Sequence, residues 1–269
     1  MIFFSMTTAE IMGRKAYKEY AFVSIGQRVA QIFLALFLYF QIGVIGIIVG
    51  YFLGSILFSY RYLFSLIKNF SLKIDNLKEK RNFTIHSYGY TLIGQTLSNY
   101  LDKVIIGAIF GYFALGLYQL GFQFFTFLSL IPTSLQQYLL PEESSGNNRR
   151  EIKILGIILS VVAAIAIFAL SPYLITNFFP TFTEAIPLVS LMSLAVIPYT
   201  VAAILTASFL ANGKSKQVFT SSAIYLTFLM ISLAIMGLTI GILGLAIAVI
   251  TAKTIQAIYL ITKRKLTQN

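Results

Sequence analysis

Long apolar stretches constrain this chain more than any other feature. A helix that crosses the roughly 30 Å hydrocarbon core of a bilayer needs about 20 residues, at about 1.5 Å per residue. Eight apolar stretches have about that length, and we expect a membrane-spanning helix in each: residues 20–40, 44–67, 84–109, 114–139, 152–179, 185–211, 218–238 and 242–262. The predicted fold class is therefore all-α, a polytopic membrane helix bundle with about eight transmembrane helices.

The composition argues in the same direction. Hydrophobic residues make up 58% of the chain and charged residues only 11%, whereas soluble globular proteins carry about 25% charged residues. So few ionised groups cannot cover a water-facing surface, which argues strongly against a soluble fold.

The basic residues indicate the orientation of the spans. The chain carries 20 Lys and Arg against 9 Asp and Glu. Sixteen of these cations fall in every second loop: Arg14, Lys15, Lys18, Lys68, Lys73, Lys78, Lys80, Arg81, Arg149, Arg150, Lys153, Lys214, Lys216, Lys263, Arg264 and Lys265. Cytoplasmic loops of membrane proteins are enriched in Lys and Arg. We therefore expect both termini in the cytoplasm, a location in the cytoplasmic membrane, and no nucleic-acid partner.

Residue types that support enzymatic chemistry are scarce. The chain has no cysteine and one histidine, His86, which excludes a disulfide framework, a thiolate nucleophile and a multi-histidine metal site. It also lacks the glycine-rich phosphate loop of ATPases. We therefore expect no catalytic residues, no metal, no cofactor and no enzyme activity.

Four cations lie inside the predicted spans. Arg61 and Lys103 are near span ends, where long side chains reach the interface. Arg28 and Lys253 are about eight to ten residues, or about 12–15 Å, from the cytoplasmic helix ends. A charge at that depth is costly and usually faces a cavity or a partner. Either a structural ion pair or long-range snorkelling explains them, or they belong to a cavity that accepts an anion.

Polar side chains recur on one face of three spans, at helical spacing. They are Ser24, Gln27, Arg28 and Gln31; Thr91, Gln95, Asn99 and Asp102; and Gln119, Gln123, Thr126, Thr133 and Gln137. Unsatisfied polar groups are expensive in hydrocarbon, so these faces either hydrogen-bond between helices or line a hydrated cavity, which is slightly favoured. The candidate substrate-binding residues are Arg28, Lys253, Gln27, Gln31, Gln95, Asn99 and Gln123.

Asp102 is the only acidic residue within a predicted span. It is a candidate for ion coupling, with structural pairing as the alternative. We do not expect it to pair with Lys103, because adjacent side chains on a helix diverge by about 100°.

Small residues and prolines give two packing expectations. Gly46, Gly50 and Gly54 form a doubled small-xxx-small pattern, which allows another helix to approach closely. Pro132 and Pro198 lie inside predicted spans, where each removes a backbone hydrogen bond and favours a kink.

The segment YLDKVIIGAIFGYFALGLYQLGFQFFTFLSLIPTSLQQYLLPEES resembles the central part of polysaccharide-biosynthesis flippases. These belong to the multidrug/oligosaccharidyl-lipid/polysaccharide exporter superfamily. The residues that carry the resemblance are Asn99, Asp102, Lys103, Gly107, Ala114, Leu115, Gly116, Tyr118 and Pro132. QRVAQIFLALFLYFQIGVIGIIVGYFLGSILFS resembles the fifth and sixth spans of the family, and FPTFTEAIPLVSLMSLAVIPYTVAAILTASFLANGKSKQ resembles the region leading into the tenth.

The resemblance implies two lobes of six helices around a cavity. This chain begins near the fifth helix of that pattern, so the first four helices are expected to be missing. Residues 1–83 would hold an N-terminal cytoplasmic segment and the last two helices of the first lobe, and residues 84–269 the six-helix second lobe. The chain would then be a truncated product or need a second chain that supplies the missing helices.

The resemblance also implies a function. Such proteins move an isoprenoid (pyro)phosphate-linked glycan between membrane leaflets by alternating access. One alternative is a cation-coupled multidrug antiporter of the same superfamily, which should hold several acidic residues in its cavity. The others are a non-transporting fragment or subunit, and a membrane-embedded glycan polymerase, against which the small outer loops argue.

Overall fold

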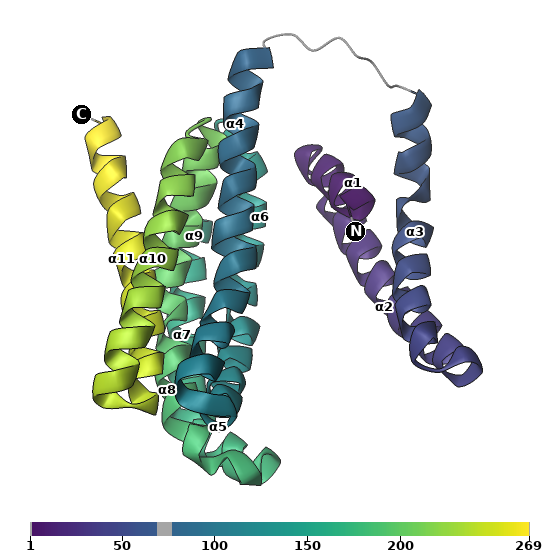
Figure 1. The fold of residues 1–269 in the computed structure, drawn as a ribbon. Coiled ribbons are helices and arrows are strands. Elements are labelled where there is room, and N and C mark those ends of the chain that lie inside the picture. The colour runs from purple at the N-terminus through teal and green to yellow at the C-terminus, as the bar shows by residue number, and fades with distance from the viewer. Residues whose placement is uncertain (1, 69–76, 269) are drawn as a thin grey trace. The chain divides into compact units, whose positions relative to one another are not determined.

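The computed structural model describes residues 2–68 and 77–268, and every regular element in these ranges is a helix (Figure 1). The chain forms two compact units, Met1–Asn76 and Leu77–Asn269. The sequence-based boundary at residues 83 and 84 falls within a helix of the second unit. Part of the polar stretch at residues 68–82, between the second and third predicted spans, lies outside the described residues, and the remainder begins that helix.

The first unit consists of α1 (Ile2–Gly13), α2 (Tyr17–Ile42) and α3 (Val44–Lys68). The helices α2 and α3 form an antiparallel hairpin that turns at Gly43, whose φ is +66°. A Cβ atom on Gly50 would lie 2.5 Å from the backbone nitrogen of Ala35. The two backbones are therefore in direct contact along the glycine face, which confirms the expected close approach.

The short helix α1 packs against both α2 and α3 and buries Thr7 and Ile11. No helix was expected here. A helix of 12 residues is only about 18 Å long, so a search for stretches that cross a bilayer does not detect it.

The second unit begins with one continuous helical stretch: α4 (Leu77–Tyr90), the π-helix η1 (Thr91–Leu97) and α5 (Ser98–Leu128). Within α5 the chain turns back at Gly111, where φ is +81°. Only glycine adopts this conformation readily. Asp102 consequently meets Tyr118 from the other side of the turn, so α5 contains the end of one predicted span and the start of the next.

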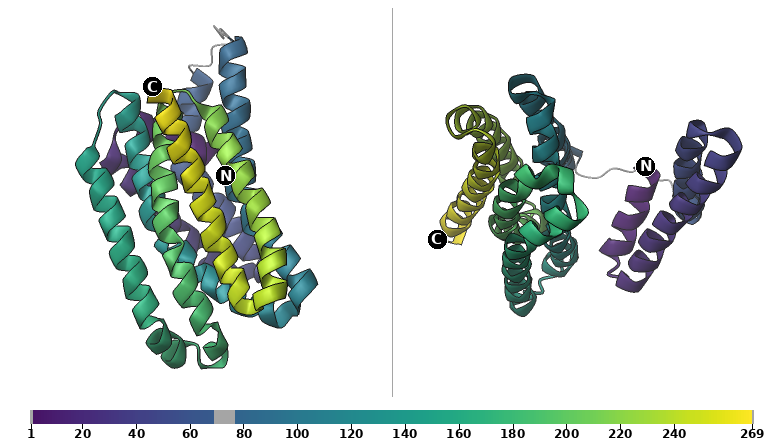
Figure 2. Two further views of the ribbon diagram at one scale, coloured as in Figure 1. Left: turned by 90° about the vertical axis from the view of Figure 1, so that its left-hand side faces the viewer. Right: turned by 90° about the horizontal axis from the view of Figure 1, so that it is seen from below.

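The rest of the second unit consists of α6 (Leu130–Ser144), α7 (Arg150–Phe178), the 3₁₀ helix η2 (Pro180–Ala185), α8 (Ile186–Leu194), α9 (Val196–Ala211), α10 (Ser215–Ile240) and α11 (Ile242–Gln268). The helix breaks after Leu128 and again after Leu194, each four residues before Pro132 or Pro198. A proline ring clashes with the carbonyl four residues earlier, so both expected kinks are confirmed. Figure 2 shows α10 and α11 side by side, joined by a turn at Gly241.

Six helical stretches in the described residues are long and apolar enough to cross a membrane, and Val44–Phe58 is a shorter apolar one. The stretch Arg81–Ser144 has 64 residues and would extend about 96 Å if straight, but it reverses at Gly111 and so provides two crossings. All eight predicted spans fall on helical segments, although residues 84–109, 114–139 and 185–211 are each divided between two or more helical elements. The chain is a multi-pass membrane protein with an all-α fold.

The core of the second unit lies between α5, α8, α10 and α11. Its fully buried side chains include Ile106, Leu117, Met192, Leu233 and Leu245. By contrast, α7 exposes a long series of aliphatic side chains, as expected for a helix at the lipid-facing periphery. The polar cavity described next is formed between the helices that surround this core.

Candidate functional site: a polar cavity around Lys253

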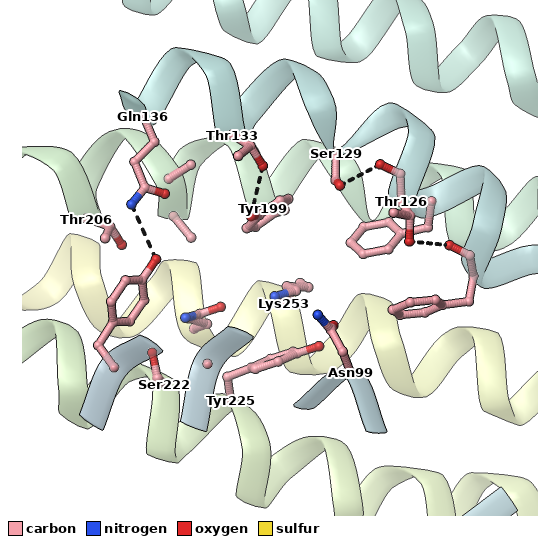
Figure 3. A pocket seen from close by; sticks show the side chains of 17 residues that line it. Asn99, Thr126, Ser129, Thr133, Gln136, Tyr199, Thr206, Ser222, Tyr225 and Lys253 are labelled. Carbon is pink, nitrogen blue, oxygen red and sulfur yellow. Dashed lines mark hydrogen bonds between the residues drawn. The ribbon is translucent and has the colours of Figure 1, made fainter. Parts of the chain in front are cut away.

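A cavity of about 230 Å³ lies within the second unit (Figure 3). Its walls come from α4, η1, α5, α6, α9, α10 and α11. The lining residues are Tyr90, Gly94, Asn99, Phe122, Phe125, Thr126, Ser129, Thr133, Gln136, Tyr199, Ala202, Ala203, Thr206, Ser222, Tyr225, Lys253 and Gln256. A water molecule occupies about 30 Å³ in the liquid, so the cavity has room for about eight waters.

Lys253 is the only charged residue among those that line the cavity. It lies in α11 and is 7% exposed. In the described part of the chain, no carboxylate oxygen lies within 4 Å of its Nζ. The ammonium group instead lies 3.6 Å from the ring centroid of Tyr225 and 4.6 Å from that of Tyr199. The positive charge of the cavity is therefore not neutralised by an acidic side chain of these residues.

Gln256 lies about one helical turn beyond Lys253 and faces the same cavity. Its side chain is 6% exposed, and its Oε1 accepts no hydrogen bond from any described residue. Buried acceptors are normally satisfied. The cavity therefore offers one uncompensated cation and one unused acceptor, which suits a ligand that carries negative charge and a hydroxyl group.

Polar side chains of α6 form hydrogen bonds to neighbouring helices along one wall of the cavity (Figure 3). Gln136 donates from Nε2 to the Tyr90 hydroxyl at 3.3 Å, which joins α6 to α4. Thr133 Oγ1 lies 3.5 Å from the Tyr199 hydroxyl, which joins α6 to α9. These hydroxyls and amides point inward because the break after Leu128 starts a new helix whose polar face is turned to the cavity.

Asp102 lies close to this cavity without lining it, and it is fully buried. Its Oδ2 accepts a 2.8 Å hydrogen bond from the Tyr118 hydroxyl, and its Oδ1 accepts one of 2.7 Å from the backbone N–H of Lys103. The Nζ of Lys103 lies 3.4 Å from Oδ1. The expectation that Asp102 and Lys103 do not pair was therefore wrong.

The pairing is possible because the lysine side chain bends back along its own helix. The Nζ of Lys103 also donates to the carbonyl oxygen of Asn99 at 2.5 Å and lies 3.8 Å from the ring centroid of Phe122. The Cβ atoms of neighbouring residues diverge, but a flexible four-carbon stem can return to the carboxylate. The role of Asp102 in ion coupling stays a prediction.

Among the predicted substrate-binding residues whose side chains the structure describes, only Asn99 and Lys253 line the cavity. Gln123 is exposed on α5, and Gln95 belongs to η1, with its side chain outside the described residues. The remaining three residues belong to the first unit.

In the first unit, the Nε2 atoms of Gln27 and Gln31 donate to Ser55 Oγ at 3.4 and 3.0 Å. Both glutamines are buried between α2 and α3, whereas Arg28 is exposed on α2. The polar stripe of this span is thus used for helix pairing at Gln27 and Gln31.

Several lining residues were missed by the sequence analysis. Gln256 could have been found, because it lies three residues from Lys253 and therefore on the same helix face. Tyr199 and Tyr225 gave no comparable signal, because aromatic residues within apolar spans are common.

Comparisons with known proteins agree with this fold. Residues 2–153 match the family model described as "Polysaccharide biosynthesis protein". A solved structure titled "Lipid II flippase MurJ, inward closed conformation" is similar, with a TM-score of 0.65 and 18% sequence identity. The alignment covers 91% of this chain and 56% of that one, so the chain spans little more than half of its length. No curated protein sequence matches.

This similarity confirms the expected exporter-type fold. That helices are missing relative to the complete fold stays a prediction. Because the family model covers more than half of the chain, the chain belongs to the polysaccharide biosynthesis protein family.

Proposed function

We propose that this chain acts in a flippase, a transporter and not an enzyme, that moves a lipid-linked oligosaccharide or polysaccharide precursor across the cytoplasmic membrane by alternating access. The family match and the fold of the similar flippase support this class of function. The substrate would be a glycan attached to an isoprenoid (pyro)phosphate. Both termini would lie in the cytoplasm, on the side of the basic loops.

The observation that carries the proposal is the uncompensated charge of Lys253 in a polar cavity. Moving a phosphate from water into a membrane interior is costly unless a fixed positive group meets it. Lys253 provides this group, and Asn99, Gln256 and the hydroxyls of the wall provide hydrogen bonds. The charged end of the substrate would lie in this cavity, while the rest of the glycan and the isoprenoid chain stay outside.

The remaining candidate residues have secondary roles in this proposal. Residues 84–269 would form the complete second lobe, and the last two helices of the first lobe would lie in residues 1–83. Arg28, Gln27 and Gln31 would contact substrate from that first lobe, together with Gln95 and Gln123 from the second. Asp102 would couple transport to an ion.

The direct test is a flipping assay with the full chain reconstituted in vesicles that contain a fluorescent lipid-linked glycan. We expect Lys253→Met to reduce flipping at least about tenfold, because loss of a buried charge contact costs more than one factor of ten. Lys253→Arg should retain part of the activity. Lys265→Met is the matched control, since Lys265 lies on the same helix and is exposed.

Two outcomes would overturn the proposal. Equal flipping rates for the wild type and Lys253→Met would refute the proposal that Lys253 forms an anion site. Transfer no faster than in protein-free vesicles would favour a non-transporting subunit, which agrees with the 56% coverage of the similar structure. A multidrug antiporter is less well supported, because no acidic residue is found among those that line the cavity.

A further inference from the structure

We infer that Tyr199 and Tyr225 form an aromatic box that positions the Lys253 ammonium group and keeps its charge available to an anionic ligand. The inference rests on the proposed function, since it concerns how the same cavity recognises a phosphate group. Tyr199 and Tyr225 are positioning residues in this view, and they act on the ligand through Lys253.

The geometry of the three side chains supports the box. The Lys253 Nζ lies 3.6 Å from the Tyr225 ring centroid and 4.6 Å from the Tyr199 ring centroid. Both distances are within the roughly 6 Å over which a cation is attracted to an aromatic face. Figure 3 shows the end of Lys253 between the side chains of Tyr199 and Tyr225. The three residues come from α11, α9 and α10, so the box exists only in the folded bundle.

The two rings are themselves held in place by the surrounding structure. Tyr225 is 5% exposed and packs into the main core of the second unit. Tyr199 lies beside Phe125, with 6.1 Å between ring centroids, and its hydroxyl lies 3.5 Å from Thr133 Oγ1. Both rings are therefore packed against other helices of the bundle beside the ammonium group.

An aromatic box differs from an ion pair in one respect that matters for transport. A carboxylate would stabilise the buried ammonium group by neutralising it, and an incoming anion would have to displace that carboxylate. An aromatic face attracts the cation through its quadrupole and carries no net charge. The box therefore attracts the ammonium group without placing a compensating negative charge beside it.

Gln256 provides an independent sign that the cavity is prepared for a ligand. Its buried Oε1 lacks a hydrogen-bond donor among the described residues and faces the same space as Lys253. Lys253 and Gln256 lie on one face of α11, and both line the cavity.

The test measures binding of inorganic pyrophosphate to the full chain in lipid nanodiscs, by calorimetry. Tyr225 is replaced first by Phe and then by phenylalanines with one, two and three ring fluorines. Each fluorine weakens the negative potential of the ring face and changes its shape little. We expect the affinity to fall step by step, to about one tenth over the series. Tyr225→Leu should bind pyrophosphate at least as weakly as the variant with three ring fluorines. If Tyr225→Leu does not fold, the fluorinated variants, which are nearly isosteric with Phe, still test the inference.

The matched control is the same fluorine series at Phe228, which lies on the same helix and is 42% exposed. It should leave pyrophosphate affinity unchanged. A flat series at position 225, with binding lost in Lys253→Met, would refute the aromatic box and leave the proposed function intact. Absence of pyrophosphate binding by the wild type would refute both.

Discussion

The hydroxyl of Tyr118 donates a 2.8 Å hydrogen bond to the buried carboxylate of Asp102 from the opposite side of the Gly111 turn. The contact joins the two halves of α5 inside the membrane. Because Asp102 is fully buried, each hydrogen-bond donor to its carboxylate contributes to the stability of the fold.

Removal of this hydroxyl should therefore destabilise the protein. We expect Tyr118→Phe to lower the free energy of unfolding by about 1–3 kcal/mol, because a buried acceptor loses a partner. Thermal unfolding in detergent measures the effect, and Tyr112→Phe is the control, since Tyr112 is 87% exposed. An unchanged unfolding temperature for Tyr118→Phe would show that water or another donor replaces the hydroxyl.

The glycine contact between α2 and α3 should tolerate no added methyl group. We expect Gly50→Ala to cost about 1–3 kcal/mol, because the new Cβ would lie 2.5 Å from a backbone atom of Ala35. The control is Gly13→Ala, where no atom lies within 4 Å of the added carbon. Both variants can be compared by thermal unfolding, and an equal effect of the two would contradict the close backbone packing.

The glutamines of the first unit offer a test that separates pairing from substrate contact. Gln31→Leu removes the 3.0 Å hydrogen bond to Ser55 Oγ. Such bonds between membrane helices contribute about 0.6 kcal/mol on average, so a small loss of stability is expected. If Gln31 also contacts substrate, flipping will fall much further than in Ser55→Ala, which breaks the same bond. Equal flipping by the two variants would assign Gln31 to helix pairing alone.

The predicted orientation of the spans can be tested directly because the chain has no cysteine. Tyr112 and Ser145 are both exposed and can each be replaced by a single cysteine. Tyr112 lies in an uncharged turn, and Ser145 lies beside a basic loop. In intact cells, a membrane-impermeant maleimide should label the cysteine at position 112 and not the one at position 145. Labelling of both from the outside would refute the cytoplasmic assignment of the basic loops.

The helices and most of their ends could be predicted from local sequence. Lipid offers no hydrogen bonds to a free backbone, so each long apolar stretch must form a complete helix. Glycines with positive φ end the stretches at Gly43, Gly111 and Gly241, and Pro132 and Pro198 mark the two internal breaks. The helix α1 and the π-helix η1 were not predicted, because one is too short to span and the other has no distinct periodicity.

The sequence by itself determined that this is a multi-pass helical membrane protein, and it placed Arg28 and Lys253 deep within predicted spans. The structure shows that Lys253 is buried and Arg28 is exposed. Only the tertiary structure decided what surrounds Lys253. The rings of Tyr199 and Tyr225 reach Lys253 from two other helices, and the glutamines of α2 turn out to contact Ser55 of α3. Helical periodicity shows which residues share a face, but the partner of that face depends on how separate helices pack.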